Sequence, residues 1–468
     1  MLDHHNNIAI SEIKFDDKSK AYGFSKYGLF SVLLLLLSSI AIPITFALHV
    51  ILLIAALINI KLALRVLFLL IIIKFFHPVF LKYDSNTAAF YWLVFIAASA
   101  RIILPNFLSA FRNWGILILY VSFLMISSFF VSRYPMISCF KAFVFLLGAL
   151  SCTVGFSALT DSEKKSFVSW IMTFMSIIII ASIPTLFIPG IGFWINGTGF
   201  QGIMQNPQVM GIILSPALAF LSIKLIRHEN NKKYVIMPAI LSIMAIMVMT
   251  GARTSLIAAG LAVFVVLVIN FSSRIKIRHR IIIFRAFLLA SASLFMLIMA
   301  LVLNPKLSSS LMSFIYKNRG DNIEESFYRS RGAGLEIHYN NFLKSPIIGN
   351  GFGVFATPDP REKITRVMGI PISAATEKGF ALVAALEESG AIGILFLFAL
   401  LFKMSKLAIA NNDPGFTGAF FSCLFVNFGE AVFFSPGGIG LYFWILIGIC
   451  TGMASYKTNT DEINGESK

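Results

Sequence analysis

The chain has 468 residues, of which 57% are hydrophobic and only 13% are charged, and its formal net charge is +16. A soluble domain of this length could not bury so much apolar surface, so the composition predicts an all-α, polytopic transmembrane protein. The basic residues stand in short clusters between apolar runs, which is typical of cytoplasmic loops and argues against a nucleic-acid partner.

The chain begins with a polar stretch, residues 1–27, which we interpret as a cytoplasmic tail. Apolar runs of the length that a membrane span needs, about 20 residues, then follow one another. The first two runs are short and could form one helix broken around Pro43, so we predict 12–14 spans. The predicted spans are 28–44, 46–60, 62–81, 88–105, 114–132, 138–159, 167–189, 207–226, 234–250, 252–271, 281–303, 380–402, 414–432 and 436–455.

Basic residues fall in every second connection, which predicts that both termini are cytoplasmic. The chain is thereby divided into transmembrane helices over 28–303, a large periplasmic loop over 304–379, further transmembrane helices over 380–455, and a cytoplasmic tail over 456–468. The outward connections are expected to converge on one face; they are 190–206, 250–253, 304–379 and 435–438.

Arg253 follows a tight turn on the outward side, where the charge rule would not place a basic residue. It also begins a helix, whose free backbone N–H groups and dipole favour an anion. Arginine can hold a phosphate through two parallel hydrogen bonds. We therefore treat Arg253 as a candidate catalytic residue; the alternative is an interfacial arginine that reaches lipid headgroups.

The 304–379 loop holds the other candidate cations. Arg331 opens a segment whose apolar residues recur at helical spacing, and it is a candidate catalytic residue at a helix start. His338 and Glu336 follow in the same segment and could act as base or acid. Arg329 and Arg361 are candidate substrate ligands, although loop arginines are commonly solvated surface charges.

Glu387 and Glu388 lie within an apolar helix, where an unpaired carboxylate is energetically costly. We expect one of them to face a water-filled cavity, and Glu388 is the candidate; the alternative is an ion pair with a loop arginine. Gly349 and Gly351 belong to a PIIGNGFG turn over 346–353 that could approach a ligand or the bilayer closely. The turn lacks the βαβ setting of a dinucleotide site, and no metal-ligand spacing is present, so neither a cofactor nor a metal is expected.

Three stretches resemble the O-antigen polymerase and ligase family of bacterial polysaccharide assembly. They are GTGFQGIMQNPQVMGIIL at 197–214, TGARTSLIAAG at 250–260, and Arg331 fifteen residues before Pro346 followed by IIGNGFGVF and by ALEESGAIGILF at 385–396.

The resemblance implies inverting, metal-independent glycosyl transfer from an undecaprenyl-diphosphate-linked oligosaccharide, at the periplasmic face of the bacterial inner membrane. Arg253 and Arg331 would hold the diphosphate, and Gln205 and Asn206 of the Asn-Pro stretch would bind substrate. The implied partners are the lipid-linked oligosaccharide, the lipid bilayer and a chain-length regulator protein.

Within that family, two departures favour a polymerase of O-antigen or exopolysaccharide repeat units. The ligase branch places a histidine near the start of the helix after the long loop, where this chain has Glu377, Lys378 and Gly379. It also has an arginine ahead of the Asn-Pro turn, where this chain has residues 198–200, Thr-Gly-Phe. A ligase that transfers polymer to lipid A core is the alternative. A lipid-linked oligosaccharide flippase would be expected to show two similar halves, and the sequence shows no internal repeat.

Overall fold

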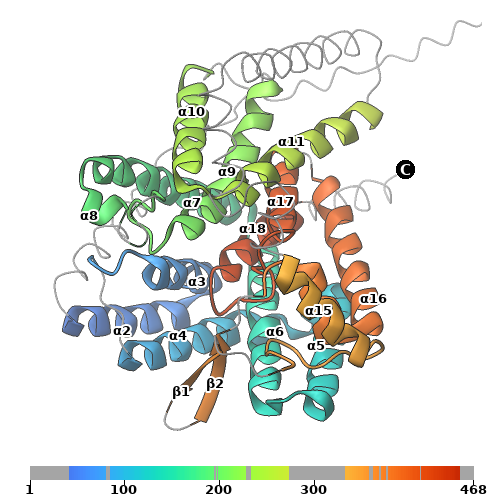
Figure 1. The fold of residues 1–468 in the computed structure, drawn as a ribbon. Helices are drawn as coiled ribbons and strands as arrows, with labels where there is room; N and C mark the ends of the chain where they lie inside the picture. Colours follow the sequence, from blue (N-terminus) through green and yellow to red (C-terminus); the bar gives the residue numbers. More distant parts are fainter. Residues whose placement is uncertain are drawn as a thin grey trace, which may run out of the picture.

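The structure is a computed structural model that describes residues 42–80, 85–193, 195, 197, 199–227, 233–273, 332–357, 362–367, 370–375, 378–411 and 413–453. These residues form a helical assembly with one small two-stranded sheet (Figure 1). The helices are α2 (Ile42–Ile58), α3 (Ile60–Phe75), α4 (Ser85–Ile103), η1 (Leu104–Asn106), α5 (Phe107–Val131), α6 (Pro135–Ser157), α7 (Asp161–Ser182), η2 (Ile183–Phe187), α8 (Pro189–Gly192), α9 (Pro207–Ile226), α10 (Lys233–Thr250), α11 (Arg253–Ser273), α15 (Ala333–Lys344), α16 (Ala381–Ile409), α17 (Pro414–Val426) and α18 (Gly440–Gly452).

The predicted helical class is confirmed, and seven helical stretches of the described chain are long and apolar enough to cross a membrane. This indicates a multi-pass membrane protein. Some predicted spans match closely: α9 has the predicted bounds, and α10 begins one residue earlier than predicted. Pro43 lies in the first turn of α2. The predicted span 281–303, most of the span 28–44 and both tails lie outside the described residues.

Several helices begin where the local sequence supplies a cap. The Asn206 side chain accepts a hydrogen bond from the Val209 N–H (2.8 Å) at the start of α9, and Pro207 occupies the first helical position, where no N–H is needed. α7 opens with a capping box between Thr160 and Glu163. These caps determine where the helices begin, whereas the apolar faces determine how the helices pack.

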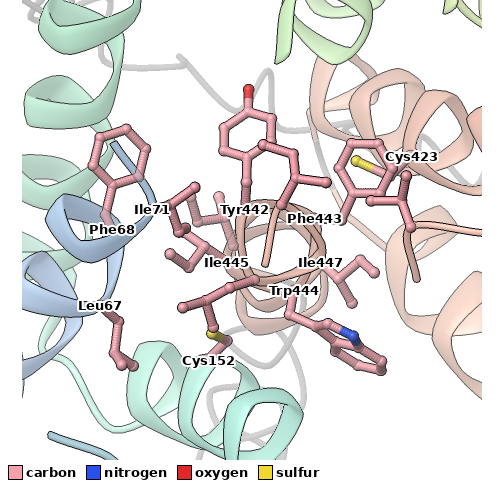
Figure 2. Packing of buried hydrophobic residues seen from close by; sticks show 14 of the residues in the cluster. Leu67, Phe68, Ile71, Cys152, Cys423, Tyr442, Phe443, Trp444, Ile445 and Ile447 are labelled. Atoms are coloured by element: carbon pink, nitrogen blue, oxygen red, sulfur yellow. The ribbon is translucent and has the colours of Figure 1, made fainter. Parts of the chain in front are cut away.

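α18 lies at the centre of the apolar core, and its side chains are buried almost all round (Figure 2). Figure 2 shows Tyr442, Trp444 and Ile445 of α18 between residues of α3, α6 and α17. Gly448 allows close packing, because a Cβ there would overlap with the Cys152 carbonyl of α6. Small residues at such contacts let two helix backbones approach each other directly.

The two strands, β1 (Lys363–Val367) and β2 (Ile370–Ala375), form an antiparallel pair within the 304–379 segment. The helical spacing after Arg331 predicts a helix in this segment, and α15 is that helix; the strand pair was not predicted. Ile, Thr and Val favour extended backbone, and only two residues separate the strands, as in a hairpin. β2 lies against α6, and an ion pair of 3.0 Å between Arg133 and Glu362 joins the start of β1 to the α5–α6 connection.

A labelling experiment tests on which side this segment lies. In a Cys139→Ser background, a cysteine introduced at Thr357 is expected to react with an impermeant maleimide in intact cells, because the charge pattern predicts that 304–379 lies outside. Cys139 is replaced because it is partly exposed, whereas the other three native cysteines are buried. Ala410→Cys, in the α16–α17 connection, is the matched control and should react only after lysis. Reaction of Thr357→Cys only after lysis would contradict the predicted topology.

Candidate functional site

α16 is interrupted at Gly390, whose backbone (φ 62°, ψ −168°) is not helical. The interruption leaves two carbonyls and two N–H groups without helical partners, and residues 346–351 bind all four. The N–H groups of Asn350 and Gly351 donate to the carbonyls of Glu387 (2.9 Å) and Glu388 (3.1 Å), and the N–H groups of Ala391 and Ile392 donate to the carbonyls of Pro346 (2.9 Å) and Ile347 (3.2 Å). The glycine-rich turn therefore supplies the backbone hydrogen bonds that α16 lacks at the break.

Two glycines make this insertion possible. Gly349 has φ +78°, and a Cβ there would overlap with the backbone of Glu388 and Ser389. A Cβ on Gly390 would overlap with the Ile347 carbonyl. Both positions combine a left-handed backbone with direct backbone contact, so only glycine fits.

Gly349→Ala is therefore expected to destabilise the protein by at least about 2 kcal/mol, because the substitution adds both strain and overlap. Gly334→Ala is the matched control: its Cβ would meet nothing within 4 Å. In helix α15 an alanine should stabilise by roughly 0.5–1 kcal/mol. Unfolding temperatures of the two purified variants in detergent measure the contrast. Equal temperatures would show that the turn does not bind tightly to the helix break.

Four ionisable side chains meet beside the break, and we call them the charge chain: His338, Glu387, Lys378 and Glu388. His338 Nδ1 lies 2.5 Å from Glu387 Oε2, Lys378 Nζ lies 3.3 Å from the same oxygen, and Lys378 Nζ lies 2.8 Å from Glu388 Oε1. All four residues are buried. Asn341 Nδ2 donates to Glu387 Oε1 (2.9 Å), so both oxygens of that carboxylate are bound.

Lys378 is the central cation of the charge chain. Burial by itself lowers the pKa of Lys378, but the adjacent carboxylates of Glu388 and Glu387 raise this pKa above its ordinary value. The ammonium therefore stays charged. Burying a charge is tolerated only with such pairing, and removing one partner of a buried pair typically costs about 3–5 kcal/mol.

Two members of the charge chain, Lys378 and Glu388, line a cavity of about 290 Å³. Two further lysines line this cavity from other helices: Lys74 at the end of α3 and Lys141 near the start of α6. Its other walls are aromatic or small residues of α4, α6, α16, the glycine-rich turn and the 431–438 segment: Trp92, Phe140, Val144, Phe352, Gly353, Ala384, Ala431, Phe434, Ser435, Pro436, Gly437 and Gly438. The cavity is thus lined by segments that are far apart in the sequence.

The two additional lysines are held by carbonyls of the cavity wall. Lys74 Nζ donates to the Gly437 carbonyl (2.6 Å) and lies 5.0 Å from the centre of the Tyr91 ring. Lys141 Nζ donates to the Gly353 carbonyl. Three lysines and one glutamate give the described lining a formal charge of +2. This cavity can therefore bind an anion next to a carboxylate.

The predicted site residues fall into four groups. Glu388 lines the cavity, and its ion-pair partner among the described residues is Lys378. His338 is buried and does not line the cavity, whereas Glu336 is exposed on the same helix. Arg329, Arg331 and Arg361 lie outside the described residues.

The remaining predicted residues are not part of the cavity lining. Arg253 begins α11, and its neighbour Thr254 packs against Gly429, in the segment that continues into the cavity wall. Asn206 caps α9, the Gln205 side chain is exposed, and the Gln205 N–H donates to the Phe75 carbonyl (2.7 Å) beside Lys74. Gly349 and Gly351 shape the turn, but Phe352 and Gly353 are its residues at the cavity.

Sequence reasoning missed Lys74, Lys141 and Lys378. The first two lie inside predicted spans, near ends that face outward in the predicted topology. A lysine within an apolar run is energetically costly, and the positive-inside rule does not explain one at the outward end. A lysine inside an apolar run, near its outward end, was therefore the sequence feature by which Lys74 and Lys141 could have been found.

No protein-family model matches the chain, and no curated protein shows significant similarity to it. The family resemblance therefore rests on the three stretches quoted above.

Proposed function

We propose that this protein is a membrane glycosyltransferase that joins undecaprenyl-diphosphate-linked repeat units into O-antigen or exopolysaccharide, at the periplasmic face of the inner membrane. The observation that carries the proposal is the cavity that Lys74, Lys141 and Lys378 line together with Glu388, beside the break of α16. The three stretches that resemble the polymerase and ligase family include that break and the turn bound to it.

The lysines suit a diphosphate leaving group. As the bond between sugar and diphosphate breaks, negative charge grows on the departing oxygen, and fixed cations in a water-poor site stabilise it. The formal charge of +2 on the described lining complements a diphosphate diester. We propose that these lysines supply the charge that a metal ion provides in other transferases. Arg253 and Arg331 remain proposed as further ligands of the same group.

Glu388 is the proposed base. In a single displacement, a hydroxyl oxygen of the acceptor sugar attacks the anomeric carbon of the donor, and the bond from that carbon to the diphosphate oxygen breaks. The bonding electron pair leaves with undecaprenyl diphosphate, and the hydroxyl proton passes to the Glu388 carboxylate. Attack opposite to the leaving group inverts the anomeric configuration.

Cavities that enclose a small ligand usually measure about 300–1,000 Å³, so this one, at about 290 Å³, lies just below that range. Its described part suits the diphosphate and the sugar next to it. The rest of the repeat unit and the polyprenyl chain would lie outside it.

The glycan of a deletion strain tests the proposal. Loss of the protein should leave lipid A core capped with a single repeat unit. Undecaprenyl-linked polymer that is not attached to lipid A would instead indicate a ligase, and repeat units retained on the cytoplasmic side would indicate a flippase. The purified protein should also extend lipid-linked repeats in the presence of EDTA; loss of activity with EDTA would contradict metal-independent transfer.

A further inference from the structure

His338 belongs to α15, yet both of its ring nitrogens are bound at the start of α16. Nδ1 lies 2.5 Å from Glu387 Oε2, and Nε2 lies 2.9 Å from the Lys378 carbonyl oxygen. The neighbours Ile337 and Tyr339 are 46% and 55% exposed, whereas His338 is 5% exposed. This side chain therefore connects the loop helix to the charge chain.

The protonation of His338 follows from its partners. A carbonyl oxygen only accepts hydrogen bonds, so Nε2 carries a hydrogen. Nδ1 and Glu387 Oε2 are close enough to share one more proton. With Lys378 and Glu388 charged, the charge chain then sums to zero, whether that proton resides on the imidazole or on the carboxyl group.

The shared proton decides how Lys378 divides its interactions. Its ammonium lies 2.8 Å from Glu388 and 3.3 Å from Glu387, so the two carboxylates compete for it. Without His338 the other three residues would sum to −1, and Glu387 would lose the imidazole with which it shares a proton. Lys378 would then shift toward Glu387 and release Glu388 from its fixed position.

We propose that His338 is a positioning residue: by sharing a proton with Glu387 it keeps the Lys378 ammonium on Glu388 and so orients the carboxylate that faces the cavity. The charge balance is independent of the reaction. Only the consequence for turnover rests on the proposed function.

The test compares a charge-unbalanced variant with a rebalanced one. His338→Ala leaves a net charge of −1, and we expect kcat for chain extension to fall about tenfold while KM for the lipid-linked donor stays within about twofold. His338→Ala/Glu387→Gln restores the net charge to zero, and kcat should return to within about threefold of the wild-type value. Tyr339→Ala, the exposed neighbour, is the control and should behave as wild type.

If His338 acts through packing alone, kcat of the double variant should be no higher than kcat of His338→Ala. That order in kcat would overturn the positioning role. Unfolding temperatures in detergent provide a second readout: they should fall in His338→Ala and recover in the double variant. If the temperatures follow this pattern but the wild-type protein transfers no sugar, the charge balance stands and the proposed function fails. If they do not recover, the charge balance itself is wrong.

Discussion

Replacing Glu388 with glutamine is expected to lower kcat for chain extension about a hundredfold or more, which is the range in which a general base contributes. The amide cannot take up the acceptor's proton. Because the substitution leaves the charge chain at +1, with Lys378 Nζ no longer 2.8 Å from a second carboxylate, the unfolding temperature in detergent should fall as well, and kcat is therefore compared on folded, purified protein. Initial rates with purified lipid-linked repeat measure the effect.

Glu336→Gln is the matched control, because it removes an exposed carboxylate from α15. It should retain the wild-type rate. A Glu388→Gln protein that extends chains as fast as the wild type would show that the acceptor needs no base in this cavity, and the proposed displacement would have to proceed without proton transfer to Glu388.

Replacing Lys74 or Lys141 with methionine should reduce kcat/KM for the lipid-linked donor about a hundredfold each, since a charge-assisted contact to a leaving diphosphate is worth about 3 kcal/mol. Methionine keeps an unbranched side chain of similar length and removes the charge. Both lysines line the cavity beside Glu388. Lys74→Arg should preserve part of the activity, since it keeps the charge but changes its shape.

Lys403→Met provides the control for this pair of substitutions. Lys403 also donates to a backbone carbonyl, that of Asn113, and lies over an aromatic ring, Trp114, but it is in the second half of α16 and does not line the cavity. Its loss should leave kcat/KM unchanged. Equal effects of Lys403→Met and Lys74→Met would mean that the loss of Lys74 acts through stability, and the diphosphate role would be wrong.

The helices could be predicted from the sequence because membrane helices consist of long apolar runs with polar or capping residues at their ends. Asn206 and Pro207 mark the start of α9 as clearly in the sequence as in the structure. The break in α16 was not predictable in the same way: Gly390 lies in an apolar run, and its backbone depends on a turn about forty residues earlier in the chain. Local propensity does not report such long-range pairing.

The candidate site was only partly predictable for the same reason. Glu387 and Glu388 could be singled out because carboxylates within an apolar helix need partners. Their neighbours at the site could not all be identified from the sequence. Lys378 lies close to Glu388 in the chain, but His338 reaches Glu387, and Lys74 reaches the cavity, only through the packing of distant segments. The arginines around Arg331 were chosen for their residue type and spacing, and they lie outside the described residues.

The turn inserted in α16 also constrains how the protein is made. α16 is among the helices long and apolar enough to span a membrane, and hydrocarbon offers no partner for the four backbone groups freed at Gly390. During biosynthesis residues 346–351 emerge before α16. The broken form can be adopted only once this turn has reached α16. The final shape of α16 is therefore set when the preceding loop folds onto it.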